Sequence, residues 1–130
     1  MRALTIITLA VLMLACATQT IPLPSGAETF ATHCASCHGS LGEGDGPVGA
    51  VMVVAVPNLR TLSQRNGGEF PAEAVAAYID GRDMPAAHGD RVMPVWGAVF
   101  DATTQLVSGA EGAEPRIEAI LIFLRELQYP

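Results

Sequence analysis

Apolar residues recur every three or four positions in several segments of this 130-residue chain, and this spacing predicts amphipathic helices. The clearest pattern lies between Glu114 and Leu127, with a proline in the first turn and acidic residues near the N-terminal end. Its apolar stripe comprises Ile117, Ile120, Leu121, Leu124 and Leu127. We expect this last helix to lie across the first helix of the domain.

A first helix is predicted over 27–37. Ser25 is a suitable N-cap and Glu28 a capping-box partner three residues later. Phe30 and Cys34 recur at helical spacing, which predicts that they share one face. His33 falls on another face of such a helix, so we expect it to be exposed.

Two further helical segments follow. One begins after Phe70, runs to about Asp80 and stops at Gly81, with an inner face of Val75, Tyr78 and Ile79. Residues 99–112 are expected to form a short helix and a loop. No partner strand is visible for any of these segments.

Two loops separate the first two helices. Residues 39–49 contain five glycines in eleven positions, which excludes a regular element and suits a loop that brings its backbone close to a flat ligand. Residues 50–57 are the most apolar stretch after the N-terminal segment. A buried strand would also fit their pattern, but we interpret them as a hydrophobic loop covering a cofactor.

The N-terminus has the features of an export signal. Arg2 precedes an apolar run over 3–14 that is short for a membrane span, and small residues follow it. We predict a signal peptide at 1–17, a linker at 18–26 and one domain at 27–130. Cleavage after Ala17 and cleavage before a lipidated Cys16 both fit the residues, and the second would tether the domain to a membrane.

Charge narrows the choice of partners. The formal net charge is −6, and every basic residue is an arginine. Removal of Arg2 with the signal would leave the domain more acidic still. This balance argues against nucleic acid and against anionic lipid surfaces as partners, so any membrane contact is expected only through the lipid on Cys16.

The stretch Cys34-Ala35-Ser36-Cys37-His38 has the C-x-x-C-H spacing of a covalent haem attachment site. Two thiols on one helical turn can bond to one porphyrin, and the histidine that follows can bind the iron. A dithiol redox motif would need a βαβ context, and a structural zinc site would need a second ligand pair. The only other cysteine is Cys16.

A second stretch offers ligands for the far side of the iron. Met84 and Met93 are each followed by proline, which stiffens the loop that presents the thioether, and His88 lies between them. Met84 follows the helix end at Gly81 closely and has little chain with which to reach the iron. Because a histidine ligand usually donates its second N–H, the Pro57 carbonyl is the candidate acceptor for His38.

These residues resemble the class I monohaem c-type cytochromes over roughly 25–129. The matching pieces are 34–39, the glycine-rich loop up to 47, Pro57-Asn58-Leu59, the helix with Ala77-Tyr78-Ile79, Met93-Pro94-Val95-Trp96-Gly97, and the last helix. The resemblance implies a small all-α fold with its helices around one covalently bound haem c. It implies that His38 is the proximal ligand.

The resemblance also favours Met93 as the sixth ligand, with Met84 as the alternative. It suggests that Tyr78 donates to the ligating sulfur, although a core tyrosine would also fit. Trp96, Arg60 and Arg82 are candidates for the haem propionates. Lysine-mediated docking, used by mitochondrial relatives, does not carry over, and we expect a docking face that is mostly apolar, with an acidic face as the alternative.

A six-coordinate iron leaves no position for substrate, so we expect an electron carrier and not an enzyme. Its donor would be a quinol-oxidising complex or a dehydrogenase, and its acceptor an oxidase or reductase. We expect it in the periplasm of a bacterium, in a respiratory or related chain. The alternative is a haem c subunit or ligand-binding sensor within a larger redox complex.

Overall fold

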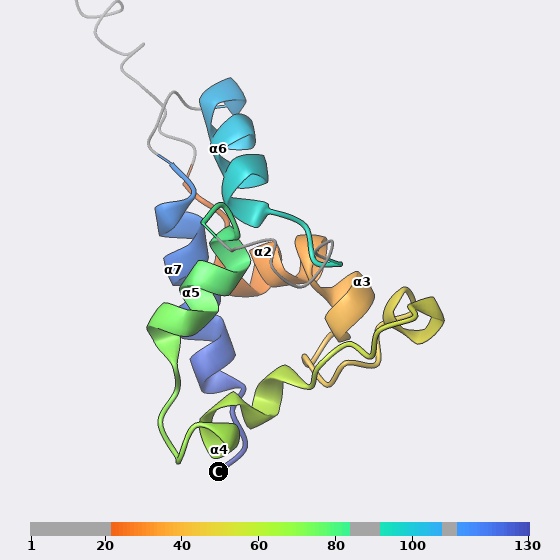
Figure 1. Cartoon of the computed structure of the whole chain (residues 1–130). Coiled ribbons are helices and arrows are strands. Elements are labelled where there is room, and N and C mark those ends of the chain that lie inside the picture. The colour runs from red at the N-terminus through yellow and green to blue at the C-terminus, as the bar shows by residue number, and fades with distance from the viewer. Residues whose placement is uncertain (1–21, 84–91, 108–111) are drawn as a thin grey trace, which may run out of the picture.

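The computed structural model describes residues 22–83, 92–107 and 112–130 (Figure 1). The elements in chain order are α2 (Gly26–His33), α3 (Ala35–His38), η1 (Gly49–Val51), η2 (Leu59–Thr61), α4 (Leu62–Arg65), α5 (Ala72–Asp80), α6 (Trp96–Val107) and α7 (Glu114–Glu126). These residues contain no β-strand, which confirms the all-α prediction. In the same ranges, no helix has the length and hydrophobicity needed to cross a membrane.

The first and last helices cross and form the centre of the core (Figure 1). Phe30 of α2 packs against Phe123 of α7 with ring centroids 5.2 Å apart. Gly26, assigned to the linker end from the sequence, is the buried first residue of α2 and lies against the Ala119 backbone. The core comprises Phe30, Ile79, Phe100, Ala113, Ile117, Ile120, Leu121 and Leu124. Four of the five stripe positions predicted for the last helix are therefore buried.

The predicted first helix is two helices with a break at Cys34. The expected capping box is present, because Ser25 and Glu28 exchange side-chain to backbone hydrogen bonds. The amide of Cys34 still donates to Phe30 at 2.9 Å, but the Cys34 carbonyl accepts from both Cys37 and His38. The prediction of one continuous helix over 27–37 was wrong at this turn, which tertiary packing sets.

Other boundaries differ from the predictions by a few residues. The polar segment after Leu59 forms η2 and α4, where the Asn58 side chain accepts from the Arg60 amide at 2.9 Å. The helix expected from residue 99 begins at Trp96. The helix ending at Gly81 was predicted correctly, and this glycine has the left-handed φ of 71° that terminates α5.

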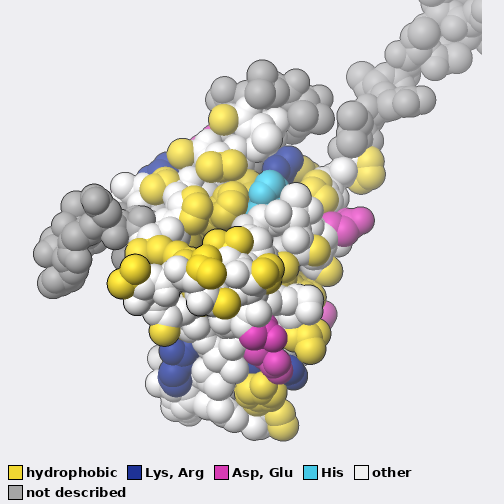
Figure 2. Space-filling view, turned by 90° about the vertical axis from the view of Figure 1, so that its right-hand side faces the viewer, with side chains coloured by type: hydrophobic (Ala, Val, Ile, Leu, Met, Phe, Trp, Pro, Cys, Tyr) yellow, Lys and Arg dark blue, Asp and Glu magenta, His cyan; other side chains and the backbone are white. Residues whose placement is uncertain are grey.

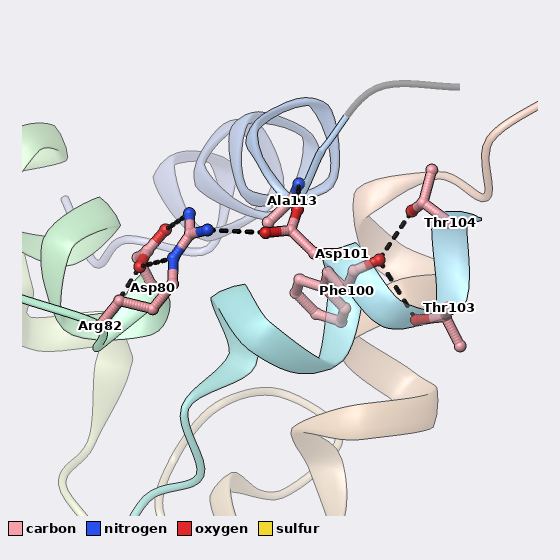
Figure 3. Close-up of polar contacts among 7 residues, drawn as sticks. All are labelled: Asp80, Arg82, Phe100, Asp101, Thr103, Thr104 and Ala113. Carbon is pink, nitrogen blue, oxygen red and sulfur yellow. Dashed lines mark hydrogen bonds and ion pairs between the residues drawn. The ribbon is translucent and has the colours of Figure 1, made fainter. Parts of the chain in front are cut away.

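Polar contacts join α5, α6 and the start of α7 (Figure 3). The Arg82 guanidinium bonds both Asp80 oxygens and, at 2.6 Å, Asp101 of α6. The other Asp101 oxygen accepts from the Ala113 amide at 2.6 Å. Two threonines of α6, Thr103 and Thr104, donate to the Phe100 carbonyl. The two Asp101 contacts hold α6, the helix that follows Met93, to the end of α5 and the start of α7.

Candidate functional site

A cavity of about 730 Å³ opens beside α2, α3 and α5 and is closed by residues 52–59 and 92–96. Its walls include seven of the site residues predicted from the sequence: Cys34, Cys37, His38, Pro57, Tyr78, Met93 and Trp96. Most of the remaining wall is apolar, with contributions from Phe30, Met52, Val56, Leu59, Val75, Ile79, Ile120 and Leu124. The volume lies within the range of cofactor sites, about 300–1,000 Å³.

The two thiols face this cavity from a single helical turn and form no disulfide. Burial, reinforced by the neighbouring Cys37, raises the pKa of the Cys34 thiol to about 12. A dithiol oxidoreductase needs a thiolate near neutral pH, whereas this thiol stays protonated. The burial of Cys34 therefore argues against a redox C-x-x-C function.

His38 ends α3 and turns its ring into the same cavity. Its Nδ1 lies 3.4 Å from the Pro57 carbonyl oxygen. A carbonyl can only accept, so Nδ1 carries the proton and Nε2 is left as a ligand atom. Burial lowers the pKa of His38, an effect partly opposed by the Pro57 hydrogen bond. The neutral ring is the form that binds iron.

The glycine-rich loop packs on the backbone of α3. The Gly44 amide donates to the His38 carbonyl at 2.8 Å, and the Gly46 amide donates to Cys37 at 3.2 Å. A Cβ at Gly46 would lie 2.5 Å from the Cys37 carbonyl oxygen, and a Cβ at Gly49 equally close. The loop lacks side chains here because its main chain lies directly against the attachment motif.

Met93 stands just before α6, half-buried in the cavity wall and packed against the core. Trp96 begins α6 and lines the cavity as well. Tyr78 also lines it and is 53 % exposed. The alternative ligands Met84 and His88 lie outside the described residues.

His33 is placed differently from its prediction. It is half-buried, lines the cavity, and packs on Trp96 and Phe100 with ring centroids 5.3 and 5.5 Å apart. Burial, followed by the charge of Arg116, lowers the pKa of its imidazole. The expectation of an exposed residue was wrong because Trp96 and Phe100 of α6 pack against this residue at the end of α2. The four-residue spacing of Trp96 and Phe100 was the sequence signal for an aromatic surface opposite it.

The predicted propionate arginines also lie elsewhere. Arg60 bonds Glu43 and the Leu127 carbonyl, Arg82 bonds Asp80 and Asp101, and neither lines the cavity. Among the arginines in the described residues, Arg65 alone lines it. Its guanidinium donates to the Asn58 and Thr61 carbonyls at 3.0 and 3.4 Å and remains exposed. Arg65 was not predicted as a site residue from the sequence.

A smaller cavity of about 450 Å³ lies between α5 and α7. It contains none of the attachment-motif residues and is lined by Asp80, Arg82, Glu114 and neighbouring side chains. No group of three or more His, Cys, Asp or Glu side chains in the described residues could hold a metal ion directly.

The family model for cytochrome c matches residues 24–105, more than half of the chain. Searches of curated proteins and of solved structures found no match. The chain belongs to the cytochrome c family, and the family brings covalently bound haem c and haem-based electron transfer. The residues fit this group, since two thiols, a correctly protonated imidazole and an apolar wall surround one cavity.

Proposed function

We propose that this protein is a one-electron carrier of the class I monohaem type, exported by a bacterium, with His38 and Met93 as axial ligands. The supporting observation is that both side chains line the cavity that also receives Cys34 and Cys37. When bound, haem c supplies a one-electron couple. The apolar wall excludes water, and the thioether favours the reduced iron, so both raise the potential.

Each residue has a definite task in this proposal. Cys34 and Cys37 attach the porphyrin edge, and His38 is oriented by its hydrogen bond to Pro57. Tyr78 and Trp96 line the same cavity as Met93. We include two hydrogen bonds in the proposal: Tyr78 donates to the ligating sulfur, and Trp96 donates to a propionate. The reduction potentials of Tyr78→Phe and Trp96→Phe would test them.

The proposed ligand set is tested by the visible and near-infrared spectrum of the purified holoprotein. Met93→Ala should abolish the sulfur-to-iron charge-transfer band and let the reduced protein bind carbon monoxide. Met84→Ala is the matched control and should leave the spectrum unchanged. The reverse pattern would assign the sixth position to Met84. Rapid carbon monoxide binding by the wild type would refute a six-coordinate carrier.

The proposed docking surface is an apolar loop beside the cavity. Val51 and Val53 are 82 % and 104 % exposed. Met52, which lies between them, and Val56, which follows them, instead line the cavity. Figure 2 views the side on which this loop lies in Figure 1, and hydrophobic side chains gather across that face. Docking through this apolar loop predicts electron transfer with a weak dependence on ionic strength.

Stopped-flow electron exchange with a quinol-oxidising complex, a dehydrogenase, an oxidase or a reductase would test this surface. Val53→Asp should slow the exchange, whereas Val99→Asp, on exposed α6 surface, is the control. A rate that rises steeply as salt is lowered would contradict an apolar face. The exposed valines also support the second candidate, a haem subunit held permanently within a redox complex. Co-purification of a stoichiometric partner would favour it.

Periplasmic location and export follow from the proposed signal at 1–17, which lies outside the described residues. Intact mass of the mature protein distinguishes its two forms. A diacylglycerol increment on a chain beginning at Cys16 would support a membrane tether. A chain beginning at Thr18 would support a freely soluble periplasmic protein.

A further inference from the structure

The C-terminal residues are tied to the loop that follows the haem-attachment motif. We call Glu43, Arg60 and Tyr129 the C-terminal cluster. The Arg60 guanidinium bonds Glu43 at 2.9 Å and lies 4.2 Å from the centre of the Tyr129 ring. The Tyr129 hydroxyl donates to the same Glu43 oxygen at 3.0 Å. The three side chains therefore form a closed triangle of contacts.

Main-chain and amide contacts extend this connection. The Tyr129 amide donates to the Arg60 carbonyl at 3.0 Å, and the Arg60 Nε donates to the Leu127 carbonyl at 3.1 Å. The Gln128 side chain donates to the Leu59 carbonyl and accepts from the Ser63 amide, both at 2.9 Å. The end of α7 and the residues after it are thus bonded along the whole of η2 and into α4.

Both segments that the cluster joins control the position of His38. Glu43 lies between Gly42, whose carbonyl accepts from the Leu59 amide at 2.7 Å, and Gly44, whose amide donates to the His38 carbonyl at 2.8 Å. On the other segment, Pro57 stands three residues before Arg60 and accepts from His38 Nδ1 at 3.4 Å. The cluster therefore links the main chain after His38 to the acceptor of its ring.

We propose that the C-terminal cluster is a positioning device for the proximal ligand, which sets the distance between His38 Nδ1 and the Pro57 carbonyl. The inference rests on the proposed role of His38 as an iron ligand. A hydrogen bond from the far nitrogen makes an imidazole a more basic ligand. A more basic ligand favours the oxidised iron. Loosening the cluster weakens this bond and raises the reduction potential.

Tyr129→Phe is the sharpest test because it removes the hydroxyl bond to Glu43 while the ring over Arg60 and the net charge are preserved. At fixed potential in a redox buffer, we expect the ratio of reduced to oxidised holoprotein to rise at least threefold. We also expect the His38 Nδ1 proton, followed by NMR, to exchange with solvent faster. The ligand-to-iron bands of the spectrum should be retained.

Glu43→Gln supplies a second variant, and Asp101→Asn is its matched control. Both remove one negative charge from an arginine pair, but Asp101 joins α6 to Arg82 and lies outside the cluster. Glu43→Gln should raise the reduced fraction and the Nδ1 proton exchange more than Asp101→Asn does. Equal effects of these two variants, or an unchanged ratio and exchange rate in Tyr129→Phe, would overturn the inference. A wild-type spectrum without histidine ligation would instead overturn the proposed function.

Discussion

Replacing Gly26 with alanine should weaken the crossing of α2 and α7. A Cβ at this position would overlap the carbonyl oxygen of Ala119 and lie 2.5 Å from its carbonyl carbon and 3.1 Å from Cβ of Phe123. The distance to the carbonyl carbon is about 1 Å less than ordinary van der Waals contact, and the obstacle is backbone, so the helices must separate.

Overpacking of this kind costs about 1–3 kcal/mol, while alanine in place of glycine in a helix returns up to about 1 kcal/mol. We expect a net loss of about 1–2 kcal/mol, seen as a lower urea midpoint with an unchanged slope for the holoprotein. The control is Ala27→Gly, an exposed neighbour that reports helix propensity alone. If Gly26→Ala is as stable as the wild type or more stable, the close contact between α2 and α7 does not require glycine at this position.

Three further predictions concern the site and its support. Thr29 is 2 % exposed and its hydroxyl oxygen has no partner in the described residues, so Thr29→Val should raise stability by about 1 kcal/mol in urea unfolding. Burial holds the pKa of His33 below 6.5, so the folded state binds this proton less readily than the unfolded state does. The free energy of unfolding should therefore be highest above pH 6.5 and decrease as the pH is lowered below it. His33→Phe should make the melting temperature depend less on pH in this range. Gly44 has φ of 87°, and a Cβ would lie 2.6 Å from the Val56 carbonyl oxygen, so Gly44→Ala should lower the yield of haem-loaded protein measured by absorbance.

Much of the helical framework could be predicted from local pattern. The stripe on α7 repeats at helical spacing and is bounded by acids and an early proline, so its burial needs no knowledge of its neighbours. Helix caps involve only residues close together in the sequence, so they can be predicted locally. The structure confirms the predicted capping roles of Ser25, Glu28 and Gly81.

Side-chain partners over long sequence distances could not be predicted in the same way. Arg60 and Arg82 were predicted as propionate partners, yet Arg60 pairs with Glu43, 17 residues away, and Arg82 pairs with Asp101, 19 residues away, in addition to the nearby Asp80. An arginine can satisfy its charge with any acid brought near it, and only the packing of the helices determines which one that is.

The sequence by itself determined the chemistry of the site, because the C-x-x-C-H spacing fixes two thiols and an imidazole on one turn whatever surrounds them. The tertiary structure alone decided what surrounds that turn. It broke the first helix at Cys34, placed His33 against Trp96 and Phe100, and brought Tyr129 to Glu43, 86 residues away. Local spacing sets which groups a short segment presents, whereas their burial and partners depend on segments distant in sequence.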